Sequence, residues 1–394
     1  MEQQMTGYPS IDKPWLKYYS EEAVNVPLPE MTMYQYIWEN NKDHLSDVAL
    51  RYYGTKITYG NLFEQIKKAT SAFYAMGVRK GDAVTIMSLH TPETIVCIYA
   101  LNYIGAIANM VYMTLAEKEI LHTLDNTESK MFFVLDAALE RVNRIKGSIA
   151  MPVVVLSVAG SMPLQIKLGY LLKVKSNKHA FLTWNDFLSK GIAPVPMAME
   201  PSVPAVIVYT SGSTGEPKGV VLGNDSLNTA VFQLLQSGKD YQRTDTFLSI
   251  IPPFLSYGIL MLHEGLTIGL TSVLWLKHEP NSVAKELVRQ KINRFAGSPD
   301  CVDALMKLGK INLSQLVDYT GGGDKLSPAK EVEINNFFRM SQASTKYLPA
   351  YGMTEFSACV ALTTNEIYKS QSVGKQQDNL NKCNKSQNRC SLQR

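Results

Sequence analysis

Cysteine and histidine are scarce in this sequence, and neither residue type forms a metal-binding or disulfide pattern. The 394 residues include five cysteines, an odd number without a CxxC pair, and six histidines without an HExxH spacing. This usage argues against a disulfide scaffold and a zinc framework and favours a reducing compartment. We therefore expect a cytoplasmic protein. The cysteines are Cys97, Cys301, Cys359, Cys383 and Cys390.

An excess of one charge is also missing from most of the chain. The formal net charge is +4, and it arises in residues 375–394, where five basic side chains accompany one acidic side chain. Residues 1–374 hold 34 basic and 34 acidic side chains. A nucleic-acid-binding protein carries a basic face on its folded body, so this composition predicts no nucleic-acid partner.

Hydrophobic runs that would cross a membrane are absent as well. Residues 94–116 lack charge, but their polar side chains and Gly105 divide them into an expected helix at 92–104 and a strand at 106–111. The first residues lack the basic segment and apolar run of a signal peptide. Residues 161–180 mix apolar side chains with four lysines. That pattern fits contact with a membrane surface or, more simply, a helix with one solvated face.

What the sequence does contain is a repeated alternation of strand and helix patterns. A strand at 48–53 precedes a helix that Thr58 can cap, in which apolar residues recur at 3.6-residue spacing until Gly77. Repeated βα units of this kind predict an α/β fold with parallel sheets between layers of helices. Further expected strands are 83–87, 131–135, 152–156, 205–209, 247–251, 272–276, 292–296 and 316–319.

The strongest local signal is a loop rich in glycine and hydroxyl side chains that follows the strand at 205–208. Its glycines free backbone N–H groups to converge on a phosphate, and Lys218 supplies a positive charge. Lys218 stands between Pro217 and Gly219, so the loop is not a Walker A motif. The predicted phosphate-binding residues are Thr210, Ser211, Gly212, Ser213, Thr214, Gly215 and Lys218.

This loop, TSGSTGEPKG at 210–219, resembles the signature of the adenylate-forming superfamily, and most of all the N-terminal domain of fatty acyl-CoA synthetases. Two later segments resemble further motifs of the superfamily in the right order: TGGGDKL at 320–326 and YGMTE at 351–355. The resemblance spans about residues 34–375. It implies a domain at 1–375, with subdomains near 34–200 and 201–375, built from two helix-flanked, mostly parallel sheets and an incomplete β-barrel.

The resemblance also implies ATP-dependent chemistry. A substrate carboxylate would attack the α-phosphate of MgATP to form an acyl-adenylate, and a thiol, typically coenzyme A, would then displace AMP. Lys218, Thr354 and Glu355 would be catalytic, with Glu355 holding Mg²⁺ because hard carboxylate oxygens suit that ion. Tyr351 would pack on the adenine, and Thr354 would contact the α-phosphate. The other implied nucleotide residues are Gly321, Gly322, Gly323, Asp324 and Gly352.

The substrate side of the resemblance lies at 251–259, where Phe254, Leu255, Tyr257 and Gly258 would line the acid pocket. Many acyl-CoA synthetases have histidine at the position of Leu255, and amino-acid-activating relatives usually have aspartate there. An amino acid would leave its ammonium unpaired beside Leu255, which is costly in a desolvated pocket. We therefore expect a fatty or otherwise apolar acid. Each of these side chains is equally consistent with a plain core position.

The resemblance ends at Lys375, whereas family members continue with a small C-terminal domain. Residues 376–394 include eight Asn or Gln, so we expect a disordered, polar, basic tail, and a truncated or frame-shifted end would explain this break. The family's ribose-binding Thr-Gly-Asp, its hinge and its C-terminal lysine have no match here. Two interpretations stay open: an acid–thiol ligase with poor or absent full turnover, or a non-catalytic nucleotide- or acyl-binding remnant that needs a partner domain.

Overall fold

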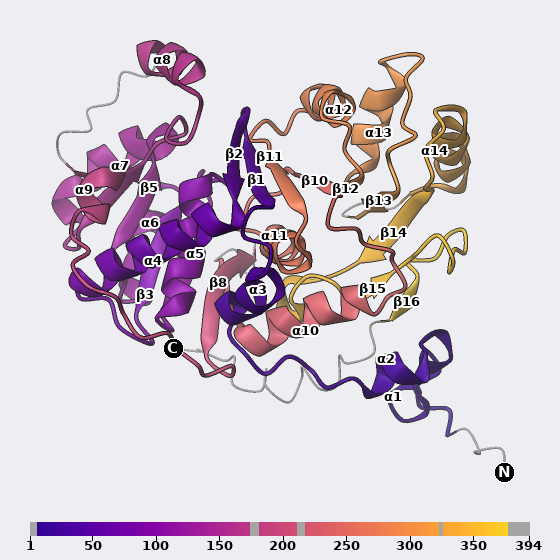
Figure 1. The fold of residues 1–394 in the computed structure, drawn as a ribbon, viewed down its shortest axis with the longest axis horizontal. Helices are drawn as coiled ribbons and strands as arrows, with labels where there is room; N and C mark the ends of the chain where they lie inside the picture. Colours follow the sequence, from indigo (N-terminus) through magenta and orange to yellow (C-terminus); the bar gives the residue numbers. More distant parts are fainter. Residues whose placement is uncertain (1–5, 174–180, 211–216, 323–325, 377–394) are drawn as a thin grey trace.

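The computed structural model describes residues 6–173, 181–210, 217–322 and 326–376. The described chain forms two β-sheets, each flanked by helices, with further helices between the two halves (Figure 1). This arrangement confirms the predicted α/β class. The predicted phosphate-loop residues Ser211–Gly215, together with Gly323, Asp324 and the tail beyond Gln376, lie outside the described residues.

The first sheet has seven strands in the order β7-β6-β5-β3-β4-β8-β9. Its neighbouring strands are parallel except for β8 and β9, which form an antiparallel hairpin. The strands are β3 (Ala83–Met87), β4 (Ile107–Met110), β5 (Phe132–Leu135), β6 (Val153–Leu156), β7 (Leu182–Thr183), β8 (Pro204–Thr210) and β9 (Lys218–Gly223).

Successive residues of a strand point to opposite faces of its sheet. Both faces of this sheet therefore carry apolar side chains, and helices cover both. Phe133 packs against Phe73 with ring centroids 5.2 Å apart. Phe132 lies in a separate core with Val142. Strands buried on both faces read as continuous apolar runs, which explains the FFVL sequence of β5. The helices of this half are α4 (Tyr59–Ala75), α5 (Pro92–Tyr103), α6 (Glu117–Asn126), α7 (Leu139–Ile145), α8 (Leu164–Lys173) and α9 (Trp184–Leu188).

The second sheet has nine strands in the order β16-β15-β14-β13-β12-β10-β11-β1-β2. Its centre is parallel, and β2, β15 and β16 are antiparallel additions at the two edges. The strands are β1 (Val48–Tyr52), β2 (Thr55–Thr58), β10 (Thr246–Ser249), β11 (Thr271–Leu274), β12 (Arg294–Gly297), β13 (Asp318–Gly321), β14 (Tyr347–Tyr351), β15 (Ala361–Leu362) and β16 (Lys375–Gln376).

Three helices lie between the halves and join them: α3 contacts α5, α10 contacts β9, and α11 contacts β10 and β11. A buried group of amides fixes this junction. Asn224 Oδ1 accepts hydrogen bonds from the Met33 backbone N–H at 2.9 Å and from the Asn102 side chain at 2.6 Å. The joining helices are α3 (Met33–Asn41), α10 (Asn224–Leu235) and α11 (Ser256–Ile268). The second sheet's other helices are α12 (Pro280–Arg289), α13 (Pro299–Met306) and α14 (Pro328–Met340).

Several expected elements are confirmed. Thr58 caps α4, its hydroxyl accepting from the Asn61 backbone N–H at 3.2 Å, and Gly77 follows the helix with φ of +89°. The strand expected at 316–319 is wrong by two residues, because β13 runs on to Gly321. Gly321 is buried, and a side chain there would overlap the Tyr347 ring, so close packing rather than β propensity decides this position.

Two expectations concern the incomplete β-barrel and the limits of the subdomains. In the described part of the chain no barrel closes; β14, β15 and β16 instead extend the edge of the open second sheet. Each sheet also takes strands from both sides of residue 200, because β8 and β9 join the first sheet and β1 joins the second. The subdomain limits near 34–200 and 201–375 stay a prediction.

Candidate functional site

The residues of the predicted phosphate loop come between the end of β8 and the start of β9 in the sequence. Thr210 is the last residue of β8 and Lys218 the first of β9, and the antiparallel register pairs the two. Lys218 is exposed. The predicted lysine thus begins a strand rather than a helix, which agrees with the prediction that this is not a Walker A loop.

The second predicted motif continues from the end of β14. Tyr351 is the last residue of that strand, and Thr354 and Glu355 form a short 3-10 turn (Thr354–Phe356) that β9 contacts. The strand bearing Lys218 therefore lies beside the turn bearing Glu355. Gly352 is required where it stands, because a Cβ would overlap the Ala358 carbonyl oxygen. Tyr351 is 52% exposed, so it is not a core aromatic, and its ring face is accessible.

The predicted substrate segment meets this motif at the start of α11. Ser256 is the first residue of α11, and its hydroxyl donates to the Thr354 hydroxyl at 3.3 Å. Leu255 stands at the N-cap of the same helix. The contact brings together segments that are about a hundred residues apart in the sequence.

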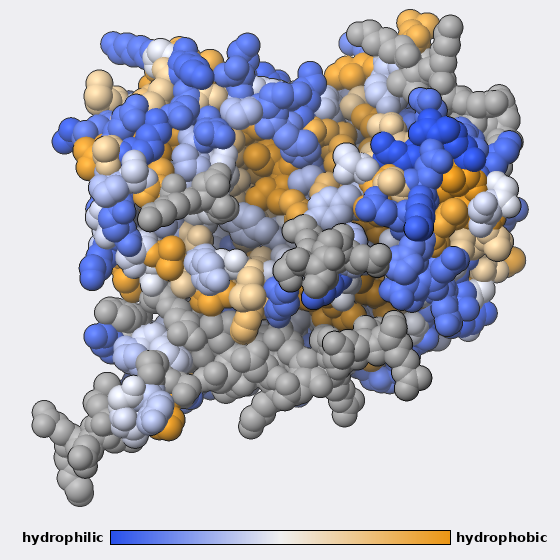
Figure 2. Space-filling model, turned by 180° about the vertical axis from the view of Figure 1, so that it is seen from behind, coloured by the Kyte–Doolittle hydropathy of each residue, from blue (hydrophilic) through white to orange (hydrophobic). Residues whose placement is uncertain are grey.

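A pocket of about 480 Å³ opens between these elements. It brings together six of the predicted residues, two from the acid side and four from the nucleotide side: Leu255, Tyr257, Gly322, Tyr351, Gly352 and Thr354. From behind, the molecule is hollowed between its two halves, and apolar side chains gather in the hollow (Figure 2). We call the 480 Å³ space the outer pocket.

Two predicted substrate residues are not among the described lining of the outer pocket. Phe254 packs against Tyr112, with ring centroids 4.8 Å apart, and joins the large core. Gly258 lies under the Pro252 carbonyl, which a Cβ would overlap. Of the four predicted acid-side residues, Leu255 and Tyr257 line the outer pocket, and the roles of all four stay predictions. Gly321 is likewise buried in β13 rather than lining the pocket.

Sequence reasoning missed other residues of the outer pocket. They follow strands of the second sheet or lie within and just after the YGMTE motif. The order of strands in the sequence could have indicated them, since the carboxyl ends of parallel strands meet at one edge of a sheet. The missed lining residues include Ile250, His278, Ser298, Cys301, Met353, Ala358 and Cys359.

The pocket's thiols are not activated. Burial raises the pKa of Cys359 to about 12 and also raises that of Cys301. Burial lowers the pKa of His278, which favours the neutral imidazole. Nucleophilic attack by these cysteines is therefore disfavoured, and the arrangement suits chemistry in which a bound substrate provides the nucleophile.

A magnesium ion would depend on Glu355. In the described part of the chain, no group of three or more His, Cys, Asp or Glu side chains is placed to hold a metal. Mg²⁺ in nucleotide enzymes is commonly held by one or two carboxylates and the substrate's own phosphates. The exposed Glu355, beside the hairpin that would carry those phosphates, fits this mode.

The segment predicted at 161–180 is described only in part. It forms α8, which projects from the first half at the top of Figure 1, while residues 174–180 lie outside the described chain. Four apolar side chains of α8 are exposed: Leu164, Ile166, Leu168 and Leu172. Searching the described helices for one both long and apolar enough to cross a bilayer finds none.

Comparison with known families matches residues 37–381 to a single description, AMP-binding enzyme. The chain belongs to the AMP-binding enzyme family. Among its relatives, the long-chain-fatty-acid–CoA ligase of Bacillus subtilis is 24% identical over 367 residues, covering 88% of this chain and 64% of the relative. The 4-coumarate–CoA ligase-like 9 of Arabidopsis thaliana is 26% identical, covering 83% of this chain and 55% of the relative. The chain thus spans less than two thirds of these relatives.

Solved structures share the fold of this AMP-binding protein. An anthranilate CoA ligase in complex with anthranoyl-AMP has a TM-score of 0.77 at 18% identity, covering 90% of this chain and 66% of that chain. A long-chain-fatty-acid–CoA ligase from Archaeoglobus fulgidus has a TM-score of 0.72 at 18% identity, covering 86% of this chain and 67% of that chain. These likenesses confirm the predicted two-sheet architecture.

Proposed function

We propose that this AMP-binding protein activates a carboxylic acid with ATP, forming an acyl-adenylate that coenzyme A then converts to a thioester. The observation that supports this most directly is the outer pocket, in which Leu255 and Tyr257 from the acid-side segment face the same space as Gly322 and Thr354 from the nucleotide-side motifs. An acid and a nucleotide bound there would meet without a rearrangement of the described elements.

The chain's own residues would position the reactants and balance charge. In the first step a carboxylate oxygen attacks the α-phosphorus of ATP and pyrophosphate leaves; in the second the thiol sulfur of coenzyme A attacks the acyl carbonyl and AMP leaves. Lys218 would offset the phosphate charge, Thr354 would donate to the α-phosphate, and Tyr351 would cover the adenine. Bound at Glu355, Mg²⁺ would screen the phosphate oxygens.

The same pocket favours an acid with an apolar carbon skeleton. Ile250, Leu255 and Met353 contribute aliphatic lining, and the position of Leu255 offers no charge for an amino acid's ammonium. The second interpretation, a nucleotide- or acyl-binding remnant that needs a partner domain, predicts the same binding without chemistry.

ATP–pyrophosphate exchange with a panel of fatty, aryl and amino acids tests the proposal. We expect exchange with apolar acids. The exchange rate should fall about 100-fold in Lys218→Ala, which removes a positive charge at the phosphates, and in Glu355→Gln, which removes the carboxylate proposed to bind Mg²⁺ there. Lys310→Ala, which changes an exposed lysine after the end of α13, is the matched control and should leave exchange unchanged. Calorimetric binding of MgATP without exchange would favour the remnant; failure to bind both MgATP and every acid of the panel would contradict both interpretations.

We also propose that α8 rests on an anionic membrane surface. Leu164 and Leu172 are 70% and 86% exposed, and residues 141–185 contain seven basic side chains and no acidic one. Exposed leucines in a segment whose sequence is rich in basic residues are the combination by which interfacial helices bind anionic bilayers.

Cosedimentation with vesicles tests this surface. We expect the chain to bind vesicles containing phosphatidylserine more strongly than vesicles of phosphatidylcholine alone, and Leu172→Ser to weaken binding about tenfold, because a leucine side chain would no longer enter the bilayer. Met340→Ser, which changes an equally exposed apolar residue on α14, is the control. Equal sedimentation of all three proteins would refute a role for α8.

A further inference from the structure

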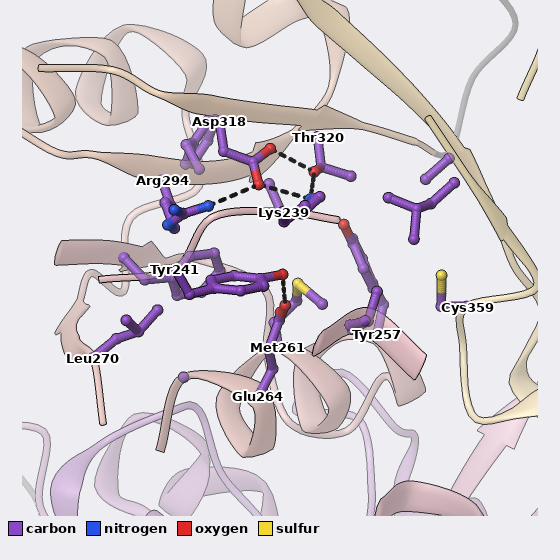
Figure 3. A pocket seen from close by; sticks show the side chains of 17 residues that line it. Lys239, Tyr241, Tyr257, Met261, Glu264, Leu270, Arg294, Asp318, Thr320 and Cys359 are labelled. Atoms are coloured by element: carbon purple, nitrogen blue, oxygen red, sulfur yellow. Dashed lines mark hydrogen bonds and ion pairs between the residues drawn. The ribbon is translucent and has the colours of Figure 1, made fainter. Parts of the chain in front are cut away.

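A second, smaller cavity lies directly behind the outer pocket. It holds about 40 Å³, room for roughly three water molecules. Its walls come from α11, β12 and β13, and it shares Tyr257, Ala350 and Cys359 with the outer pocket. We call it the inner chamber; Figure 3 shows its lining.

The inner chamber is bounded by a buried charge network rather than by aliphatic side chains alone. Asp318 accepts from the Lys239 ammonium at 2.7 Å and from Arg294 at 3.4 Å. Arg294 also pairs with Asp245 at 2.7 Å, and each of these four side chains is at most 10% exposed. Thr320 accepts from Lys239 at 2.8 Å. The ionic groups are therefore already matched, two cations with two carboxylates.

A fifth ionisable group completes the chamber without adding a fixed charge. Glu264 of α11 accepts from the Tyr241 hydroxyl at 2.5 Å. Burial raises the pKa of Glu264, which favours its neutral form. A ligand group with a full charge would find no free countercharge here and would have to be desolvated.

One buried hydroxyl of this region has no hydrogen-bond partner among the described residues. The Tyr257 hydroxyl is buried and makes no hydrogen bond within the described residues. In Figure 3 its oxygen points toward Lys239 and Thr320. Tyr257 also lines the outer pocket. Buried hydroxyls are nearly always satisfied by protein, water or ligand, so this atom marks a place where a hydrogen-bonding group is expected.

We infer that the preferred acid carries an uncharged hydrogen-bonding group, such as a hydroxyl or ketone, at the end of its apolar skeleton remote from the carboxylate, and that this group binds the Tyr257 hydroxyl at the mouth of the inner chamber. The inference rests on the proposed function, because it assumes that the carboxylate end lies beside Thr354. Tyr257 is a specificity-determining residue in this scheme.

A plain fatty acid fits the same space less well. Its methyl end would displace water from the Tyr257 hydroxyl and from the ionic groups without replacing any hydrogen bond. A dicarboxylic acid would place a second anion beside a network that is already neutral. Sites that provide a partner for a substrate hydroxyl discriminate strongly against the analogue that lacks it.

Calorimetric titration of the full chain tests the inference without requiring turnover. Mg²⁺ and α,β-methylene-ATP, which cannot release pyrophosphate, would be present throughout. The probes are fatty acids of six to twelve carbons, the matching ω-hydroxy acids and the matching dicarboxylic acids. We expect an ω-hydroxy acid to bind at least about fivefold tighter than its plain counterpart, and the dicarboxylic acid to bind most weakly.

Tyr257→Phe is the informative variant, because it removes only the oxygen. We expect the ratio of plain to ω-hydroxy dissociation constants to fall to about one, and the variant to stay folded since the lost hydroxyl has no protein partner. Tyr74→Phe, a half-exposed tyrosine on α4, should keep the wild-type ratio.

The outcomes separate the two proposals. Equal or tighter binding of plain acids by the wild-type chain would overturn the inference and leave the proposed function intact, whatever the variant does. A hydroxy-acid preference that survives in Tyr257→Phe would overturn the assignment to Tyr257. Failure of every acid to bind would overturn the inference and the proposed function together.

Discussion

Replacing Asp318 with alanine is expected to lower the free energy of unfolding by about 3–5 kcal/mol. Burial raises the pKa of Asp318, but Lys239 and Arg294 outweigh it and hold that pKa below its usual range. Without the carboxylate, both cations would remain nine-tenths buried, and breaking a buried pair costs far more than the pair contributes. The loss is a large part of the 5–15 kcal/mol typical of a folded domain. Urea denaturation followed by circular dichroism measures it.

A surface ion pair gives the matched control. Glu39 and Lys42 of α3 pair at 2.7 Å, but their side chains are 51% and 44% exposed. Glu39→Ala removes a carboxylate from a lysine in water, so we expect a change within about 0.5 kcal/mol. Equal denaturation midpoints for Asp318→Ala and Glu39→Ala would show that the buried network does not stabilise the fold.

Acid is expected to destabilise the fold through two buried histidines. Burial lowers the pKa of His90 to about 4 and that of His263 to about 3, whereas both titrate near 6.5 in the unfolded chain. The unfolded state therefore binds more protons as the pH falls below 6.5. Each histidine therefore contributes fully to the free energy of unfolding above pH 6.5. This contribution is lost as the pH falls to the pKa of the folded state, by about 3 kcal/mol for His90 and about 5 kcal/mol for His263.

Two buried carboxyl groups act in the opposite direction. Burial raises the pKa of Glu93 and of Glu264. Their contribution to the free energy of unfolding is therefore present at low pH and is lost as the pH rises. The pH dependence of the wild-type chain is the sum of both effects, and a histidine variant is needed to separate them.

His263→Gln provides that separation. The imidazole lies between Asn228 Oδ1 at 2.7 Å and the Tyr99 hydroxyl at 3.0 Å, and glutamine keeps a polar group there without a proton to bind. Between pH 4 and 6 the slope of unfolding free energy against pH should fall by about 1.4 kcal/mol per unit relative to wild type. His122→Gln, at an exposed position, is the control. An unchanged slope in His263→Gln would contradict a buried, neutral His263.

The elements that the sequence predicted best are those with a local physical cause. Thr58 caps α4 because a threonine oxygen at that position reaches a backbone N–H, and Gly77 ends it because glycine adopts positive φ without strain. The FFVL pattern of β5 reflects burial on both faces. By contrast, the strand end at Gly321 was misplaced, since its close packing on Tyr347 comes from another strand.

The residues of the candidate site likewise divide into those that local sequence indicated and those whose surroundings depend on tertiary packing. The segments carrying Leu255, Thr354 and Lys218 were found from their own residues and from a resemblance, and the structure places them around or beside one pocket. Phe254 packs against Tyr112 and is not among the described lining of the outer pocket, so its role in acid binding stays a prediction. The roles of Lys218 and Glu355 stay predictions until exchange is measured.

The sequence by itself determined the family, the α/β class and the segments predicted to carry nucleotide chemistry, because glycine-rich loops and strand–helix alternation depend on neighbouring residues. Only the tertiary structure decided what lies behind the outer pocket. Lys239, Glu264 and Asp318 are far apart in the chain, and each would pass for a solvated surface charge in its local sequence. Their burial around one chamber depends on how the fold brings α11, β12 and β13 together, a non-local arrangement that no short stretch of sequence records.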